Sequence, residues 1–197
     1  MYKLVIGTAG AVALATMGCV DARDEFNNFN DRLIDASGTG IDAPIVSELP
    51  DVNGTFLVKA RPNLGSTDFF FYFIATVTFT PVTENTGHFH WVVQPLDFET
   101  FVPVGDTLTP QDGDVDSTAT VTVGLAGLLP GRANSVSQSD VTLNGSVQAL
   151  LQSEDFFCGP ISGTAGSVSL NGSSFAATRF TGELGTELPV SALHACP

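Results

Sequence analysis

The sequence predicts an all-β domain, namely a small antiparallel up-and-down barrel of about eight strands, with a two-sheet β-sandwich as the alternative. Three observations lead to this class. Apolar and polar residues alternate along many short segments, turn signals separate most of them, and no long helical pattern interrupts them. Consecutive strands joined by short turns are antiparallel, but periodicity does not decide between barrel and sandwich.

Composition narrows the function classes. The 197 residues suit one domain, and 43% hydrophobic with 14% charged residues excludes a disordered chain and a coiled coil. Seven basic against 21 acidic residues give a net charge of −14. Binding to nucleic acid or to an anionic membrane surface needs clustered cations, so neither is expected.

The N-terminal residues predict export. Lys3 precedes an uncharged run at 4–18 that is too short to span a bilayer, which is typical of a secretory signal peptide at 1–18. The six residues ending in Gly18 and Cys19, LATMGC, resemble the lipobox of bacterial lipoproteins, in which the Cys is lipidated and becomes the new N-terminus. The resemblance implies a membrane anchor at Cys19 and, with Val20 following, the bacterial outer membrane. The alternative is an ordinary signal peptide with Cys19 as a spare thiol.

Residues 19–53 are expected to hold the lipidated Cys, a short helix and a linker. Apolar residues at spacings of three and four, with acids early and a base late, predict an amphipathic helix over 21–36. Glycines and prolines in 37–53 are typical of a spacer.

The β domain is expected over 54–197. Phe56, Val58 and Ala60 alternate with polar residues, and the same pattern continues in 69–80. The Asn144-Gly145 pair is ambiguous, because it suits either a hairpin turn or a strand that continues through it. Further strands are predicted at 87–94, 97–104, 117–125, 139–151, 159–168 and 173–182.

One local pattern favours the barrel. Asn53-Gly54-Thr55-Phe56 opens the first strand and Arg179 lies in the last. This is similar to calycins, the superfamily of lipocalins and avidins, in which Gly-x-Trp begins the first strand and a late basic side chain packs over the aromatic ring. Phe56 stands in the place of that Trp. The resemblance implies that Arg179 covers Phe56 in a closed barrel.

Cysteine use agrees with an exported protein. With Cys19 acylated, Cys158 and Cys196 remain as a pair, and two isolated cysteines lack the close spacing of a zinc site. We expect a disulfide between them.

Two clusters suggest metal ligands. His88 and His90 share one face of a strand, where two imidazoles suit zinc or copper, but the simpler interpretation buries Phe89 and Trp91 and turns both histidines to water. The second cluster, Asp112, Asp114 and Asp116, resembles the start of a calcium loop, with a solvated acidic turn as the alternative.

Catalysis is not expected, because the sequence has no nucleophile elbow, no His-Glu-x-x-His and no phosphate-binding glycine loop. Two non-catalytic envelope functions remain. A barrel would bind a small apolar ligand without a cofactor, in a lumen lined by Phe56, Phe71, Phe73, Trp91 and Val121. Alternatively, a packed domain contacts another envelope protein or a glycan through 69–73 or the acidic loop.

Overall fold

The computed structural model describes residues 48–64, 69–185 and 193–197. The predicted signal peptide, the lipidation site Cys19 and the predicted helix at 21–36 lie outside these residues. No helix within the described ranges is long and apolar enough to cross a membrane.

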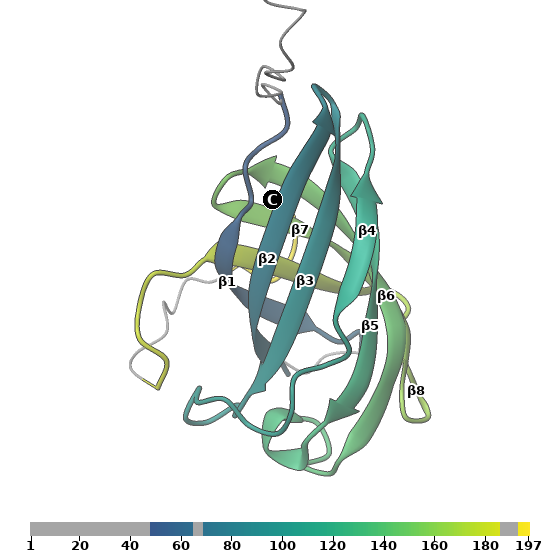
Figure 1. Cartoon of the computed structure of the whole chain (residues 1–197). Coiled ribbons are helices and arrows are strands. Elements are labelled where there is room, and N and C mark those ends of the chain that lie inside the picture. Colours follow the sequence, from purple (N-terminus) through teal and green to yellow (C-terminus); the bar gives the residue numbers. More distant parts are fainter. Residues whose placement is uncertain (1–47, 65–68, 186–192) are drawn as a thin grey trace, which may run out of the picture. The chain divides into compact units, whose positions relative to one another are not determined.

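The described chain forms an antiparallel up-and-down barrel (Figure 1). Each long strand pairs with the next along the chain, and β1 pairs with β9, which joins the first and last strands of the wall. The predicted calycin-like barrel is confirmed, and the sandwich alternative is wrong. The strands are β1 (Gly54–Arg61), β2 (Phe71–Thr83), β3 (Thr86–Leu96), β4 (Gln111–Val115), β5 (Thr120–Leu129), β6 (Val141–Ser153), β7 (Phe156–Ala165), β8 (Val168–Ser169) and β9 (Ser173–Arg179), with a 3-10 turn, η1 (Gly131–Ala133), after β5.

The wall closes between β4 and β5 without a regular hydrogen-bonded ladder. The backbone N–H of Thr109 donates to Ala126 O at 2.9 Å, and the indole N–H of Trp91 donates to Gly124 O at 3.2 Å. Gly113 permits the close approach, because a Cβ there would lie 2.7 Å from side-chain carbons of Val121 and Val123. We call this line between β4 and β5 the seam.

Aromatic rings fill the barrel. The two-residue period turns alternate side chains inward, and Phe157 lies at the centre, with ring centroids 4.9 Å from Phe56, 5.9 Å from Phe89 and 6.2 Å from Phe175. All four rings are at most 1% exposed. The interior is therefore a packed core at this level.

One predicted strand and one predicted loop need correction. The predicted strand at 97–104 is a loop, because the Asp97 side chain accepts hydrogen bonds from the backbone of Glu99 and Thr100 and turns the chain, leaving one isolated bridge from Leu96 to Pro103. The segment that was predicted to be an acidic loop contains strand β4. Its inward positions hold Gln111, Gly113 and Val115, and only Val115 is a buried apolar side chain, so the strand lacks the apolar alternation that marks the other strands.

The Asn144-Gly145 pair does not form a hairpin. Strand β6 continues through it, and Gly145 pairs with Leu125 on one side and Gly163 on the other. A Cβ on Gly145 would lie 2.3 Å from Ser162 O. Glycine here serves close strand packing.

The predicted disulfide between Cys158 and Cys196 is confirmed, with the two Cα atoms 5.3 Å apart. Cys158 lies on β7 beside Ala176 of β9, and both are buried although their neighbours along the strands point into the core. The hydroxyl of Ser174 also donates to His194 O at 2.9 Å. The disulfide therefore fastens the last described residues to the outer wall.

Candidate functional site: the two ends of the barrel

One end of the barrel is closed by Arg179, and we call it the capped end. The guanidinium carbon of Arg179 lies 5.0 Å from the centre of the Phe56 ring, as the calycin resemblance implies. Gly54 has φ +138°, and a Cβ there would lie 2.5 Å from Nη1 of Arg179. Glycine at this position lets the guanidinium reach across the start of β1.

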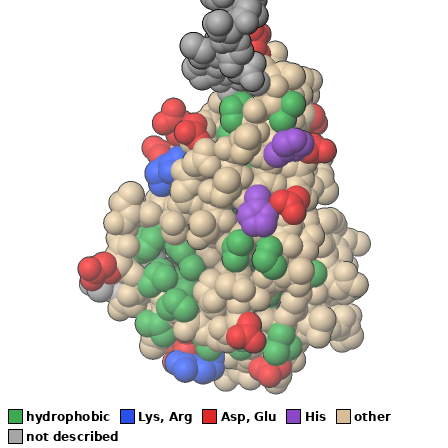
Figure 2. Space-filling model, viewed as in Figure 1, with side chains coloured by type: hydrophobic (Ala, Val, Ile, Leu, Met, Phe, Trp, Pro, Cys, Tyr) green, Lys and Arg blue, Asp and Glu red, His purple; other side chains and the backbone are tan. Residues whose placement is uncertain are grey.

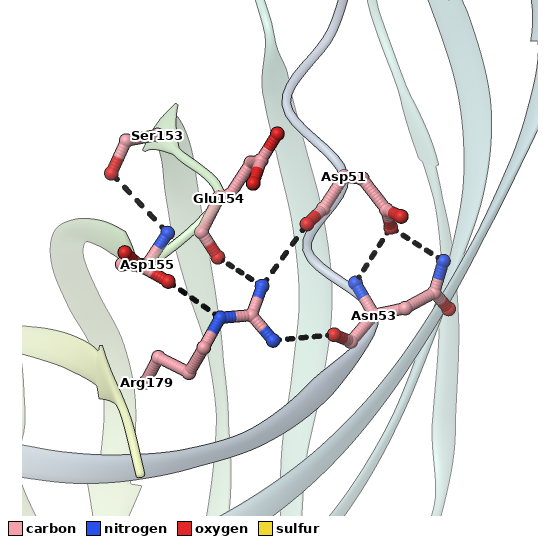
Figure 3. Close-up of polar contacts among 6 residues, drawn as sticks. All are labelled: Asp51, Asn53, Ser153, Glu154, Asp155 and Arg179. Atoms are coloured by element: carbon pink, nitrogen blue, oxygen red, sulfur yellow. Dashed lines mark hydrogen bonds and ion pairs between the residues drawn. The ribbon is translucent and has the colours of Figure 1, made fainter. Parts of the chain in front are cut away.

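The same guanidinium ties three chain segments together (Figure 3). Nη1 donates to Asn53 O at 2.6 Å, and Nη2 donates to Asp51 O at 3.1 Å and to Glu154 O. Nε donates to the Asp155 carboxylate at 2.6 Å. Charge-assisted bonds of this kind are stronger than neutral ones, so they hold the segment before β1 against the β6–β7 turn.

The segment before β1 completes the cap. The Asn53 side chain bonds both backbone groups of Phe79 on β2, accepting from its N–H at 2.7 Å and donating to its carbonyl at 2.9 Å. Leu49 and Val52 from this segment join the core, with Val52 fully buried. Among the described residues, the Arg179 hydrogen bonds and the buried Leu49 and Val52 close this end.

The opposite end carries an apolar pocket, and we call this end the mouth. It lies where β1 and β7 end and where β2 and β6 begin, at the lower end of the barrel in Figure 1. Its cavity volume is about 50 Å³. The lining residues come from loops and strand ends: Pro62, Leu64, Phe71, Asn134, Val136, Ser137, Val141, Ala165, Val168 and Leu170.

The polar lining groups of the pocket face their own loop. The Asn134 amide donates to Ser137 Oγ at 2.7 Å and to Ser139 O at 2.8 Å, and its oxygen accepts from Val136 N at 3.1 Å. Asn134 is 2% exposed. The pocket therefore offers a guest an apolar surface and shape, with the Asn134 amide already engaged.

An ion pair braces the rim of the mouth. Oδ2 of the buried Asp97 lies 2.6 Å from Nη2 of Arg132, which is 68% exposed. The hydrogen bond from the Thr100 backbone N–H, helped by the bond from Glu99 and by the Arg132 charge, lowers the pKa of Asp97. Asp97 is therefore a charged acceptor that shapes the 97–100 turn.

The predicted lumen residues fall into two groups. Phe56, Phe73, Trp91 and Val121 lie in the packed core and are at most 2% exposed. Of the five, only Phe71 lines the pocket at the mouth. The loop residues of the pocket were not predicted, because loops carry no periodic signal. Pro62 and Leu64, directly after a strand, are the sequence feature that pointed to this end.

The three aspartates do not form the predicted loop. Asp112 and Asp114 point outward from β4, and Asp116 lies in the turn before β5. The Thr118 hydroxyl donates to Asp116 at 2.6 Å, and this bond, with those from the backbone of Thr120 and Thr118, lowers the pKa of Asp116. Asp116 thus organises a β-turn, and calcium binding stays a prediction.

His88 and His90 point away from the core, as the simpler interpretation expected. Their side chains are 68% and 40% exposed, whereas Phe89 and Trp91 between and beside them are buried. Nδ1 of His88 lies 2.6 Å from Asp114, and Nδ1 of His90 lies 2.7 Å from Asp112. The structure therefore brings the two metal candidates of the sequence together on one outer face.

Comparison with known proteins adds no relative: no protein-family model matches the chain, and no curated protein matches it significantly.

Proposed function

We propose that the chain is a lipid-anchored, non-catalytic protein of the bacterial outer membrane, whose barrel binds the end of a small apolar ligand at the mouth. The observation that carries the proposal is the apolar pocket between the loops of that end. Small-molecule sites are typically concave and mostly apolar, with few polar groups, and the pocket has this character.

The size of the pocket limits the ligand. A cavity of about 50 Å³ is well below the roughly 300–1,000 Å³ of sites that enclose a drug-sized molecule. The guest therefore inserts only a terminal group of a few carbon atoms, and the rest of it lies over the mouth.

The direction of the chain supports this arrangement. The described chain enters the barrel at the capped end, where Asp51 and Asn53 are bound by Arg179. A tether from Cys19 would join the barrel at that end. A guest would reach the mouth from the periplasm or the cell surface.

A titration of the full chain with 1-hexanol tests the pocket. We expect the amide NMR signals of Phe71, Val136 and Ala165 to shift in a saturable way. Ala165→Leu fills the pocket and should abolish the shifts, whereas Thr142→Leu places the same leucine side chain at an exposed position of β6 and should preserve them. Shifts that are absent, or that persist in Ala165→Leu, would contradict the proposal.

The anchor has a separate test. Cells supplied with labelled palmitate should incorporate the label into the protein, and Cys19→Ser should abolish both the label and membrane attachment. Unlabelled protein whose membrane attachment is unchanged by Cys19→Ser would remove the anchor from the proposal without affecting the pocket.

A second candidate is contact with another envelope protein, and the packed interior together with an outer aromatic cluster favours it. Tyr72 packs edge-on to Phe101 with ring centroids 5.1 Å apart, and Nζ of Lys59 lies 4.1 Å from the centre of the Phe70 ring. Tyr72, Ile74 and Phe101 are partly buried and pack against Leu57 and Leu96. Figure 2 shows hydrophobic side chains gathered on the left of the face in view. Aromatic residues are enriched at protein interfaces.

This second candidate is tested in cells. A photo-crosslinking residue in place of Phe101 should give one discrete conjugate that Tyr72→Ser weakens, and the same residue at the exposed Thr122 should give none. Conjugates that are absent, or that form equally from both positions, would exclude the aromatic cluster as an interface.

A further inference from the structure

The outer surface of β3 and β4 carries two matched His–Asp pairs. In the antiparallel register His88 lies opposite Asp114 and His90 opposite Asp112, so each imidazole meets a carboxylate directly across the strands. The distances from Nδ1 to the carboxylate oxygen are 2.6 and 2.7 Å. Figure 2 shows histidine side chains beside acidic ones on this face.

These contacts fix which nitrogen of each ring is available. An ionised carboxylate only accepts hydrogen bonds, so in each pair Nδ1 carries the proton and donates it. The lone pair of the neutral ring then lies on Nε2. Metal-binding histidines typically have this arrangement, in which a carboxylate holds one nitrogen and the other nitrogen binds the metal.

The two rings are also placed to act together. His88 and His90 are two residues apart on one strand and share its outer face, about 7 Å apart along the strand. They line one surface hollow of about 310 Å³ with Asp112, Asp114, Thr78 and Thr80. A hollow of this volume can hold a cation with bound water.

We propose that Nε2 of His88 and Nε2 of His90 bind one divalent transition-metal ion at this hollow, with Asp112 and Asp114 orienting the rings. Among the described residues no three His, Cys, Asp or Glu side chains group around one ion, so water supplies the other ligands. A site with two protein ligands exchanges its metal with solution, unlike a closed structural zinc site.

The ligand type sets the selectivity. Imidazole nitrogens suit copper, nickel and zinc, and affinity for a given site rises from nickel to copper and falls again at zinc. Calcium and magnesium prefer oxygen ligands and should not compete. The net charge of −14 attracts any cation to the protein. A preference for copper over calcium therefore distinguishes binding at the two histidines from this nonspecific attraction.

Calorimetric titration of the full chain, purified without a histidine tag, tests the site. We expect one equivalent of Cu²⁺ to bind saturably, more tightly than Ni²⁺ or Zn²⁺, with no heat from Ca²⁺. The electron paramagnetic resonance spectrum of the copper form should show nitrogen ligands. His88→Ala and His90→Ala should each abolish saturable binding, and His194→Ala is the matched control that should retain it.

The carboxylates are tested as positioning residues. Asp112→Asn and Asp114→Asn keep the shape of the pairs but weaken the hold on the rings, and each should lower copper affinity by about 10- to 100-fold. Thermal unfolding of each variant checks that the barrel is intact. The proposal would be overturned if the parent chain bound no copper. It would also be overturned if His88→Ala and His90→Ala bound copper as tightly as the parent chain.

Discussion

The capped end and the mouth close the same barrel by different means. At the capped end one guanidinium holds three backbone carbonyls and a carboxylate, and Asn53 bonds both backbone groups of Phe79. At the mouth, apolar loop residues meet around a pocket of about 50 Å³, and the Asp97–Arg132 ion pair lies on an exposed rim.

This difference indicates a division of roles. Directional bonds at the capped end join segments far apart in the sequence, so that end is expected to carry stability. Loops at the mouth meet mainly through apolar contacts and leave space between them. Their side chains can therefore change conformation when a ligand binds. If the division holds, substitutions at the capped end should cost more free energy than substitutions at the mouth.

The disulfide in the wall between the two ends provides the reference for both. Its removal is expected to cause the largest loss in the free energy of unfolding. The Cys158–Cys196 disulfide spans 38 residues. In the chain-entropy account, Cys196→Ser lowers the free energy of unfolding by roughly 4 kcal/mol. Urea unfolding measures this loss, and reduction of the parent protein should reproduce it.

Arg179→Met breaks the capped end. The variant keeps an apolar stem over Phe56 but loses every donor to Asp51, Asn53 and Glu154, so we expect a loss of about 3 kcal/mol in the free energy of unfolding. Urea unfolding checks the value, with Thr142→Met at an exposed position of β6 as the surface control. If Arg179→Met lowered the free energy of unfolding no more than the control, the Arg179 hydrogen bonds would not contribute to stability.

At the rim of the mouth, Asp97→Ala removes the acceptor of two backbone bonds, and we expect a loss of about 1–2 kcal/mol. The pKa of Asp97 is lowered from its ordinary value of 3.8 by folding. Its contribution is therefore present above that value and lost as the pH falls through the folded pKa. Asp97→Asn does not titrate, so its stability difference from the parent should shrink between about pH 5 and about pH 2.

The smallest effect is expected inside the mouth. Val136→Ser replaces a half-buried lining residue and should lower the free energy of unfolding by less than about 1 kcal/mol, while it weakens hexanol binding. Urea unfolding and the NMR titration measure the two effects on the same sample. A stability loss equal to that of Arg179→Met would show that the two ends do not divide the roles.

The sequence predicted the wall better than the mouth. Alternation in segments such as 54–61 and 71–83 identifies strands, because each has one face in the core. Strand β4 escaped prediction, since Gln111 and Gly113 take two of its three inward positions and only Val115 is a buried apolar side chain. The pocket escaped because its loop residues meet only through the three-dimensional path of the chain.

The seam between β4 and β5 determines where the barrel opens locally. Every neighbouring pair of strands in the wall except β4 and β5 is joined by a regular hydrogen-bonded ladder. Local opening is therefore expected to begin between β4 and β5. Amide protons of β4 and of the facing side of β5 should then exchange with deuterium before those of β1 and β9, whose ladders are continuous on both sides. Strands β4 and β5 would then separate while the Arg179 hydrogen bonds at the capped end remain formed.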